Sequence, residues 1–286
     1  VTATNTCGTS PAQTVAINVT PLPAQPAAFT TSSANVCRGQ SNVAFIVPDD
    51  PTVNYIWNYG GTGATITNTR GSALINFDAT ATSGTLSVTA TNGCGLSTSR
   101  TINITVNPLP TVFNVTGGGT LCLGGAGAPI SLSGSQTGVS YQLKDASNSN
   151  VGAAIAGTGA SLNFGNIATA GIYTVLATNT TTTCNQIMNG TATVTVDPVS
   201  VGGTVTTSAT VCSGTNSGTL TLSGQTGNVV RWESSVNGGA SWTSIANTTT
   251  SQAYSNLTVT TLYRAVVKSG VCIEANSGAA TITIDP

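Results

Sequence analysis

The chain has 286 residues, enough for one to three domains, but only 5% of them are charged. There are 7 Lys and Arg, 8 Asp and Glu, and no histidine. A chain with no basic stripe is not expected to bind nucleic acid, catalysis by a Ser-His-Asp or Cys-His site is excluded, and no apolar run is long enough for membrane insertion.

The leading segment (residues 1–23) reads VTATNTCGTSPAQTVAINVTPLP and matches VTATNGCGLSTSRTINITVNPLP at 88–110, with a fixed offset of 87 residues. Weaker copies occupy 173–198 and 263–286. Each copy ends in a strand-like run followed by a proline. The match predicts that the leading segment is the last hairpin of a truncated module, and that the chain is a segment of a longer polypeptide.

Three whole modules are predicted to follow: the first (24–110), the second (111–198) and the third (199–286). Each opens with a cysteine before a strand, and an aromatic residue follows 19 or 20 positions later. The three cysteine and aromatic pairs are Cys37 and Trp57, Cys122 and Tyr141, and Cys212 and Trp232.

Apolar and polar residues alternate with a period of two in TINITV, TATVTV and TITI, which is typical of strands with one buried face. No stretch of ten residues has apolar residues at the 3.6-residue spacing of an amphipathic helix. With strands of about 6 residues, a module of this size holds about seven, which suits an all-β immunoglobulin-like sandwich. We expect the repeated aromatic positions to be core: Trp57, Tyr141, Trp232, Tyr173 and Tyr263, with Leu86 in the place of the last two in the first module.

Seven cysteines fit one disulfide in each module. The repeat predicts the pairs Cys37 with Cys94, Cys122 with Cys184, and Cys212 with Cys272, each tying the start of the first strand to the last hairpin. Cys7 aligns with Cys94, so it is expected to be unpaired in this chain, with a partner about 57 to 62 residues upstream. A zinc site is the alternative, but it needs closely spaced ligand pairs that the sequence lacks. Disulfides imply an oxidising compartment.

Few other residues point to chemistry. Trp242, in NGGASWTSI, has no equivalent in the other modules, and we consider it a candidate ligand contact as well as a packing residue.

Asp49 and Asp50 lie in a PDDP turn, so a solvated turn is favoured over a catalytic pair. Asp197 and Asp285 at module ends are too few for calcium. Threonine runs suit ordinary exposed strand positions better than an ice-binding array. No cofactor, metal or enzyme activity is expected.

Two modules resemble known families. The first module, with YIWNYGGTGATITNTRGSALINFDATATSGTLSVTATNGCGLS, resembles the PKD-like domains repeated in large secreted proteins of Bacteroidetes. The third, with W…GGxSWTxI…TxYRAVVxSGxC, resembles the immunoglobulin-like repeat of the same proteins, and the second is similar in outline. The resemblance implies a multi-repeat cell-surface protein, often an adhesin or gliding-associated protein, exported by the type IX system.

The sequence therefore predicts a stalk or filament segment of a bacterial cell-surface protein. Proline linkers limit bending, and low charge permits self-association into filaments or bundles. The main alternative is an adhesive module that binds a glycan or protein through loops of 199–286. A weaker one is an accessory segment of a secreted enzyme.

Overall fold

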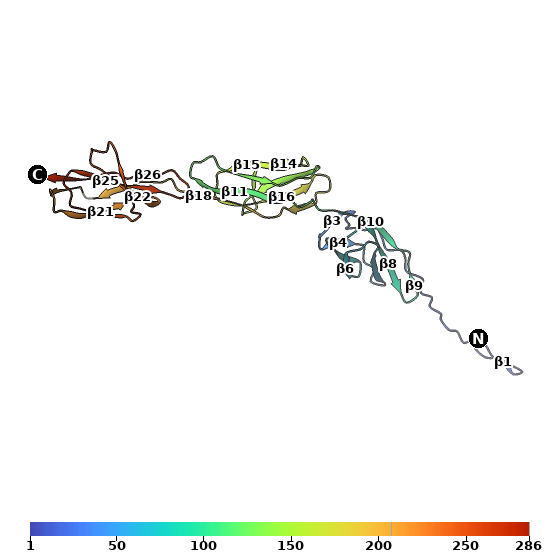
Figure 1. Cartoon of the computed structure of the whole chain (residues 1–286). Coiled ribbons are helices and arrows are strands. Elements are labelled where there is room, and N and C mark those ends of the chain that lie inside the picture. The colour runs from blue at the N-terminus through green and yellow to red at the C-terminus, as the bar shows by residue number, and fades with distance from the viewer. Residues whose placement is uncertain (207, 286) are drawn as a thin grey trace. The chain divides into compact units, whose positions relative to one another are not determined.

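The computed structural model describes residues 1–206 and 208–285, and the regular structure of this part of the chain consists of strands (Figure 1). The chain divides into two compact units. The first comprises Val1–Leu109 with Thr181–Cys184, and the second comprises Pro110–Thr180 with Asn185–Pro286. The expected all-β fold class is confirmed.

The leading segment of the first unit forms a short hairpin. Its strands are β1 (Thr4–Asn5) and β2 (Gly8–Thr9). The Asn5 side chain accepts a hydrogen bond from the Cys7 amide at 2.8 Å, and Asn92 accepts the same bond from the Cys94 amide at 2.9 Å. The repeated phrase therefore forms the same Asn-stabilised turn in both places.

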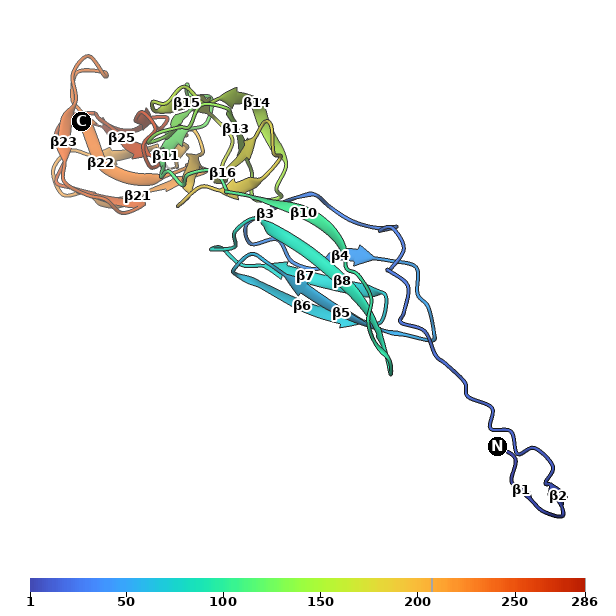
Figure 2. The ribbon, with the colours of Figure 1, turned by 90° about the vertical axis from the view of Figure 1, so that its right-hand side faces the viewer.

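The first module is a sandwich of two sheets (Figures 1 and 2). One sheet contains, in order, β3 (Asn35–Cys37), β10 (Arg100–Asn107), β8 (Gly84–Asn92) and β5 (Asn54–Tyr59), with β9 (Gly95–Leu96) paired to β8. The facing sheet contains, in order, β4 (Val43–Ile46), β7 (Ser72–Phe77) and β6 (Ala64–Thr69). The first strand, β3, runs parallel to the last strand, β10, whereas the other strand pairings of the module are antiparallel.

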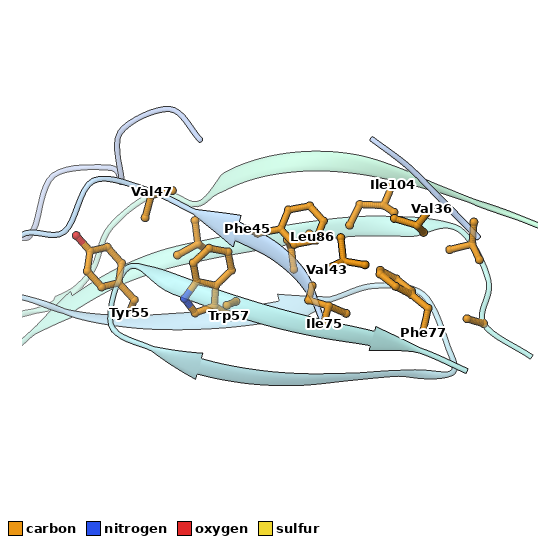
Figure 3. Packing of buried hydrophobic residues seen from close by; sticks show 14 of the residues in the cluster. Val36, Val43, Phe45, Val47, Tyr55, Trp57, Ile75, Phe77, Leu86 and Ile104 are labelled. Atoms are coloured by element: carbon orange, nitrogen blue, oxygen red, sulfur yellow. The ribbon is translucent and has the colours of Figure 1, made fainter. Parts of the chain in front are cut away.

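The core of the first module lies between these sheets, and Figure 3 shows side chains from both filling it. Buried residues alternate along β7, where Ala73, Ile75 and Phe77 point inward. Trp57 is buried among them, and its ring N–H donates a hydrogen bond to the Arg70 carbonyl at 3.1 Å. The expected core role of Trp57 is confirmed.

In the second module one long strand, β11 (Val115–Cys122), takes part in two sheets. Its first three residues pair antiparallel with one neighbour, and its last five pair parallel with the last strand. Gly117 and Gly118 make this switch with φ of 94° and 82°. A Cβ on either would collide with a backbone carbonyl, of Pro129 or of Thr193, so glycine is needed at both positions.

The other strands of the second module extend these sheets. On one side of β11 lie β12 (Ala128–Leu132) and then β15 (Leu162–Ile167). On the other side follow β18 (Ala192–Asp197), β16 (Gly171–Asn179), β13 (Val139–Lys144) and β14 (Asn150–Ala156), with β17 (Asn185–Ile187) paired to β16.

The third module has the same arrangement, but its first strand is in two pieces. The piece β19 (Thr204–Thr206) pairs with β21 (Ser217–Ser223), which pairs with β24 (Ser251–Ser255). The second sheet contains, in order, β20 (Ala209–Cys212), β27 (Ala280–Asp285), β25 (Thr261–Lys268), β22 (Asn228–Ser235) and β23 (Thr243–Ile245), with β26 (Ala275–Asn276) paired to β25. As in the other modules, the first strand ends parallel to the last.

The buried hydrophobic residues of the described chain form three separate clusters, one in each predicted module. The remaining repeated positions that we expected to be core belong to them: Leu86, Tyr141, Tyr173, Trp232 and Tyr263. The expectation for these residues is confirmed, and the fold is a tandem series of immunoglobulin-like sandwiches.

Candidate functional site

Three cysteines end the first strands of the modules. Cys37, Cys122 and Cys212 close β3, β11 and β20, and each lies opposite the final residue of its module's last strand. These opposite residues are Asn107, Asp197 and Asp285. Because the first and last strands are parallel, all three cysteines lie at the end where the chain leaves the module.

Three other cysteines lie at the opposite end of the modules. Cys94, Cys184 and Cys272 follow the long strands β8, β16 and β25, in the turns that lead back toward the last strand. In the first module β10 covers eight residues, and the hairpin continues beyond its start. At about 3.3 Å per residue, Cys37, beside the end of β10, and Cys94, in the hairpin turn before β10, are therefore roughly 35 Å apart along the strand direction. A disulfide requires Cα atoms within about 7 Å, so the two cannot pair within one module.

The predicted pairings of Cys37 with Cys94, Cys122 with Cys184 and Cys212 with Cys272 are therefore wrong. The structure joins Cys37 to Cys184, with a Cα separation of 5.6 Å, and Cys122 to Cys272, with 4.9 Å. The partners are 147 and 150 residues apart, so each bond connects one predicted module to the next. The prediction placed the first-strand cysteine at the wrong end of the sandwich. The alternation of apolar and polar residues shows which face of a strand is buried, but it does not show that the first strand pairs parallel with the last.

The residues around Cys122–Cys272 build a polar joint within the second unit. The Asp197 carboxylate accepts a hydrogen bond from the Val271 amide at 2.9 Å, and the Cys272 sulfur lies 3.2 Å from the Pro198 carbonyl oxygen. Gly270, with φ of 47°, brings its backbone so close that a Cβ would collide with that carboxylate. The Asp197 carboxylate thus holds the hairpin that carries the cysteine, a role that the sequence did not reveal.

A second pair of residues continues the joint. The Ser269 amide donates a hydrogen bond to the Ser200 hydroxyl at 2.9 Å, and both residues are buried. An unpaired buried amide would cost about 1–3 kcal/mol, so this bond fixes where the hairpin meets the linker. The short Asp-Pro-Val-Ser run at 197–200 therefore supplies two of the acceptors on which the hairpin rests.

The hairpin that carries Cys94 also packs on the linker before its module. The Asn92 side chain donates a hydrogen bond to the Pro21 carbonyl at 3.0 Å, and a Cβ on Gly95 would approach Leu22. Pro21 holds the place in its repeat that Pro198 holds in the joint just described. Cys94 itself, like Cys7 and Cys212, has an exposed free thiol.

Trp242, the candidate ligand contact, is half-buried beside a charged cluster in the third module. The Arg264 guanidinium carbon lies 4.0 Å from the centroid of its ring. Arg264 also pairs with Glu233 at 2.7 Å, and Arg231 bridges Glu233 and Glu274 at 2.8 Å each. The cation occupies one face of the indole, so Trp242 has a packing role. A glycan or protein ligand at this loop stays a prediction.

Glu233 is the most buried acid of this cluster, with 9% of its side chain exposed. Burial acts to raise its pKa, but hydrogen bonds from Arg231 and Arg264 outweigh burial and hold the pKa below its ordinary value. The carboxylate is therefore ionised and fully paired, as a structural ion pair requires.

Within residues 1–206 and 208–285, no group of three or more His, Cys, Asp or Glu side chains could hold a metal ion. In the same ranges the structure holds no helical segment that could serve as a membrane span. Asp49 pairs with Arg70 at 2.9 Å and Asp50 accepts a bond from the Thr52 hydroxyl at 2.7 Å, which agrees with a turn.

Two segments of the chain match known protein families. Residues 22–104 match the family described as PKD-like domain, and residues 201–286 match one described as a domain of unknown function (DUF8696). The resemblance of the first module to PKD-like domains is confirmed. A comparison with curated proteins gives no match.

Solved structures that resemble the chain contain tandem domains at low sequence identity. The A168–A170 domains of titin are 18% identical and cover 90% of this chain and 99% of theirs, with a TM-score of 0.43. Immunoglobulin domains 1–4 of Sidekick-1 are 13% identical, over 90% and 74%, with a TM-score of 0.39. The N-terminal eight Ig domains of DSCAM are 12% identical, and the match covers 100% of this chain and 39% of that eight-domain chain, with a TM-score of 0.49.

Together, the PKD-like match and the sandwich fold are typical of structural or adhesive modules. Disulfides persist in oxidising compartments, so the two disulfides indicate a secreted or extracellular protein.

Proposed function

We propose that the chain is a stalk segment of a large secreted bacterial cell-surface protein of the adhesin type, in which disulfides fasten each module to the next. The observation that carries this proposal is the Cys122–Cys272 bond, which adds a second covalent connection beside the linker at Pro198. The PKD-like match of residues 22–104 supports a repeat protein of this kind.

The joint restricts motion in two ways. Proline at position 198 fixes one backbone angle of the linker and removes a hydrogen-bond donor. The disulfide, and the bond from Val271 to Asp197, tie a turn of the third module that is about 70 residues further along the chain back to the end of the second module. A hinge about the linker would have to break that hydrogen bond and would still be held by the disulfide.

The two disulfides also overlap along the chain, which changes how tension is carried. The loop closed by Cys37–Cys184 and the loop closed by Cys122–Cys272 share the 62-residue stretch from Cys122 to Cys184. The shared part is the shortest covalent path between the two disulfides, so it becomes taut first when the modules unfold. The other two stretches between the disulfides, Cys37–Cys122 and Cys184–Cys272, are longer, so they cannot extend fully.

Stretching single molecules from their two termini tests the mechanical role. With both bonds intact, the part from Cys37 to Cys272 extends by at most 62 residues, about 220 Å, whereas the reduced chain extends by 235 residues, about 850 Å. We therefore expect reduction to lengthen the fully unfolded molecule by roughly 600 Å.

The matched control is the double variant Cys94→Ser/Cys212→Ser, which removes thiols that form no bond in this chain. It should extend as little as the parent when oxidised. An oxidised parent that extends as far as the reduced one would refute the proposed load path. Lateral packing of such stalks, favoured by the low charge, stays a prediction.

A further inference from the structure

Two of the free cysteines occupy the same positions as those that form disulfides. Cys212 ends β20 opposite Asp285, as Cys122 ends β11 opposite Asp197. Cys94 lies in the hairpin turn of its module, as Cys184 and Cys272 do in theirs. Each module therefore has one cysteine at its exit end and one at its opposite end, and these two lack partners.

The backbone around Cys212 repeats the geometry of the bonded positions. The amide that follows it, of Ser213, donates a hydrogen bond to the Asp285 carbonyl at 3.2 Å. The corresponding bonds run from Leu123 to Asp197 at 2.8 Å and from Arg38 to Asn107 at 3.0 Å. The exit end of the third module is thus built like the two ends that already carry a disulfide.

The surroundings of Cys94 repeat the other half of the joint. Its hairpin rests on the Pro21–Leu22 linker, as the Cys272 hairpin rests on Asp197 and Pro198. In that joint the hairpin cysteine, Cys272, is bonded to the first-strand cysteine of the preceding module.

We propose that Cys212 and Cys94 are complementary halves of further module-to-module disulfides. Cys212 bonds to the hairpin cysteine of a β-sandwich module of the same kind joined after Pro286, and Cys94 bonds to the first-strand cysteine of one joined before Pro21. This inference rests on the proposed stalk function and extends it. The same joint recurs between successive modules, and the two cysteines of each joint are about 150 residues apart in the sequence.

The cysteine expected upstream of Cys7 is then the partner of Cys94. Counted back from Cys94 by 147 to 150 residues, it falls in the same region as a position 57 to 62 residues before Cys7. Cys7, in a turn like that of Cys94, belongs to the hairpin class and takes a cysteine one module further away.

Each bond forms by thiol–disulfide exchange with a small-molecule or protein disulfide. One cysteine thiolate attacks a sulfur of that oxidant, forms a mixed disulfide and releases one oxidant thiol. The second cysteine thiolate then attacks the cysteine sulfur and displaces the other oxidant thiol. The two cysteines lose two electrons and two protons in total, and the oxidant gains them.

A chain extended by a second copy of residues 199–286 that carries Cys212→Ser, placed directly after Pro286, tests the inference, because only the original Cys212 then remains. The fusion recreates an Asp-Pro-Val-Ser linker identical to that at 197–200. After oxidation, proteolysis without reduction and mass spectrometry should find Cys212 bonded to Cys272 of the added copy. In the matched control, with Cys272→Ser in the added copy only, Cys212 should remain open to alkylation.

A free Cys212 in the first fusion, with an added copy that unfolds cooperatively, would overturn the inference. If that copy does not fold, a fusion of residues 22–109 after Pro286 replaces it, with Cys94 of the added copy as the expected partner. The sequence of the parent polypeptide is an independent test. The inference predicts one cysteine 147 to 150 residues after Cys212 and another 147 to 150 residues before Cys94, and it fails if either is missing.

The same peptide map separates this inference from the proposed function. If Cys122–Cys272 of the original part is present and Cys212 is free, the inference fails and the jointed stalk stands. If Cys122–Cys272 is also absent, the proposed function itself fails.

Discussion

At the scale of single residues, the two tryptophans of the third module have different tasks. Trp232 is fully buried in the core, and its ring N–H donates a hydrogen bond to the Thr249 carbonyl at 2.8 Å. Trp242 lies at the surface under Arg264. Their environments predict different costs for the same substitution.

Replacing Trp232 by alanine should lower the free energy of unfolding by about 3–5 kcal/mol, since it leaves a large cavity. Trp242→Ala should lower it by about 1–2 kcal/mol, because it removes one cation–π contact and a half-buried ring. Urea unfolding of both variants beside the parent measures the difference. Equal losses, or a larger loss for Trp242→Ala, would contradict these assignments.

Glu233 predicts how the third module responds to acid. Its folded pKa lies below the unfolded value of about 4.3, so ionisation stabilises the folded state. That contribution is fully present above the unfolded pKa and is lost as the pH falls through the folded pKa. Glu233→Gln should be less stable than the parent at neutral pH, and the gap between their melting temperatures should close in acid. A gap that stays constant from about pH 7 to about pH 3 would disprove the role of the ion pairs.

At the scale of strands, the sequence predicted which side chains face the core but not which strands are neighbours. Alternation in β10 and β18 and the regular aromatic positions follow from burial of one face, so they were readable. The parallel pairing of β3 with β10 depends on how the first strand crosses from one sheet to the other. That crossing is a property of the packed module, and only the glycine run at 117–119 hints at it.

The crossing in β11 can be tested at Gly118. Gly118→Ala combines a left-handed φ with a collision against the Thr193 backbone, whereas Gly152→Ala has a similar φ of 65° and open space around the new Cβ. Strain from φ alone should cost about 1 kcal/mol in Gly152→Ala, and Gly118→Ala should cost more. Thermal unfolding of the two variants compares them. If both lose the same stability, the close approach at Gly118 does not matter.

At the scale of the whole molecule, the cysteine spacings permit two frameworks. Partners 57 to 62 residues apart close each module on itself, and partners 147 or 150 residues apart connect successive modules. Both pairings repeat once per module, so the cysteine spacing alone does not distinguish them. From the sequence alone we therefore predicted the shorter loops. The physical distinction is which ends of the sandwiches carry the sulfurs, and the strand pairing decides it.

Disulfide mapping of the oxidised 286-residue chain is therefore the most direct test of the central claim. Digestion without reduction, after free thiols are blocked, should release peptides that link Cys37 to Cys184 and Cys122 to Cys272, with Cys94 and Cys212 alkylated. Peptides that link Cys37 to Cys94, or Cys212 to Cys272, would contradict the account.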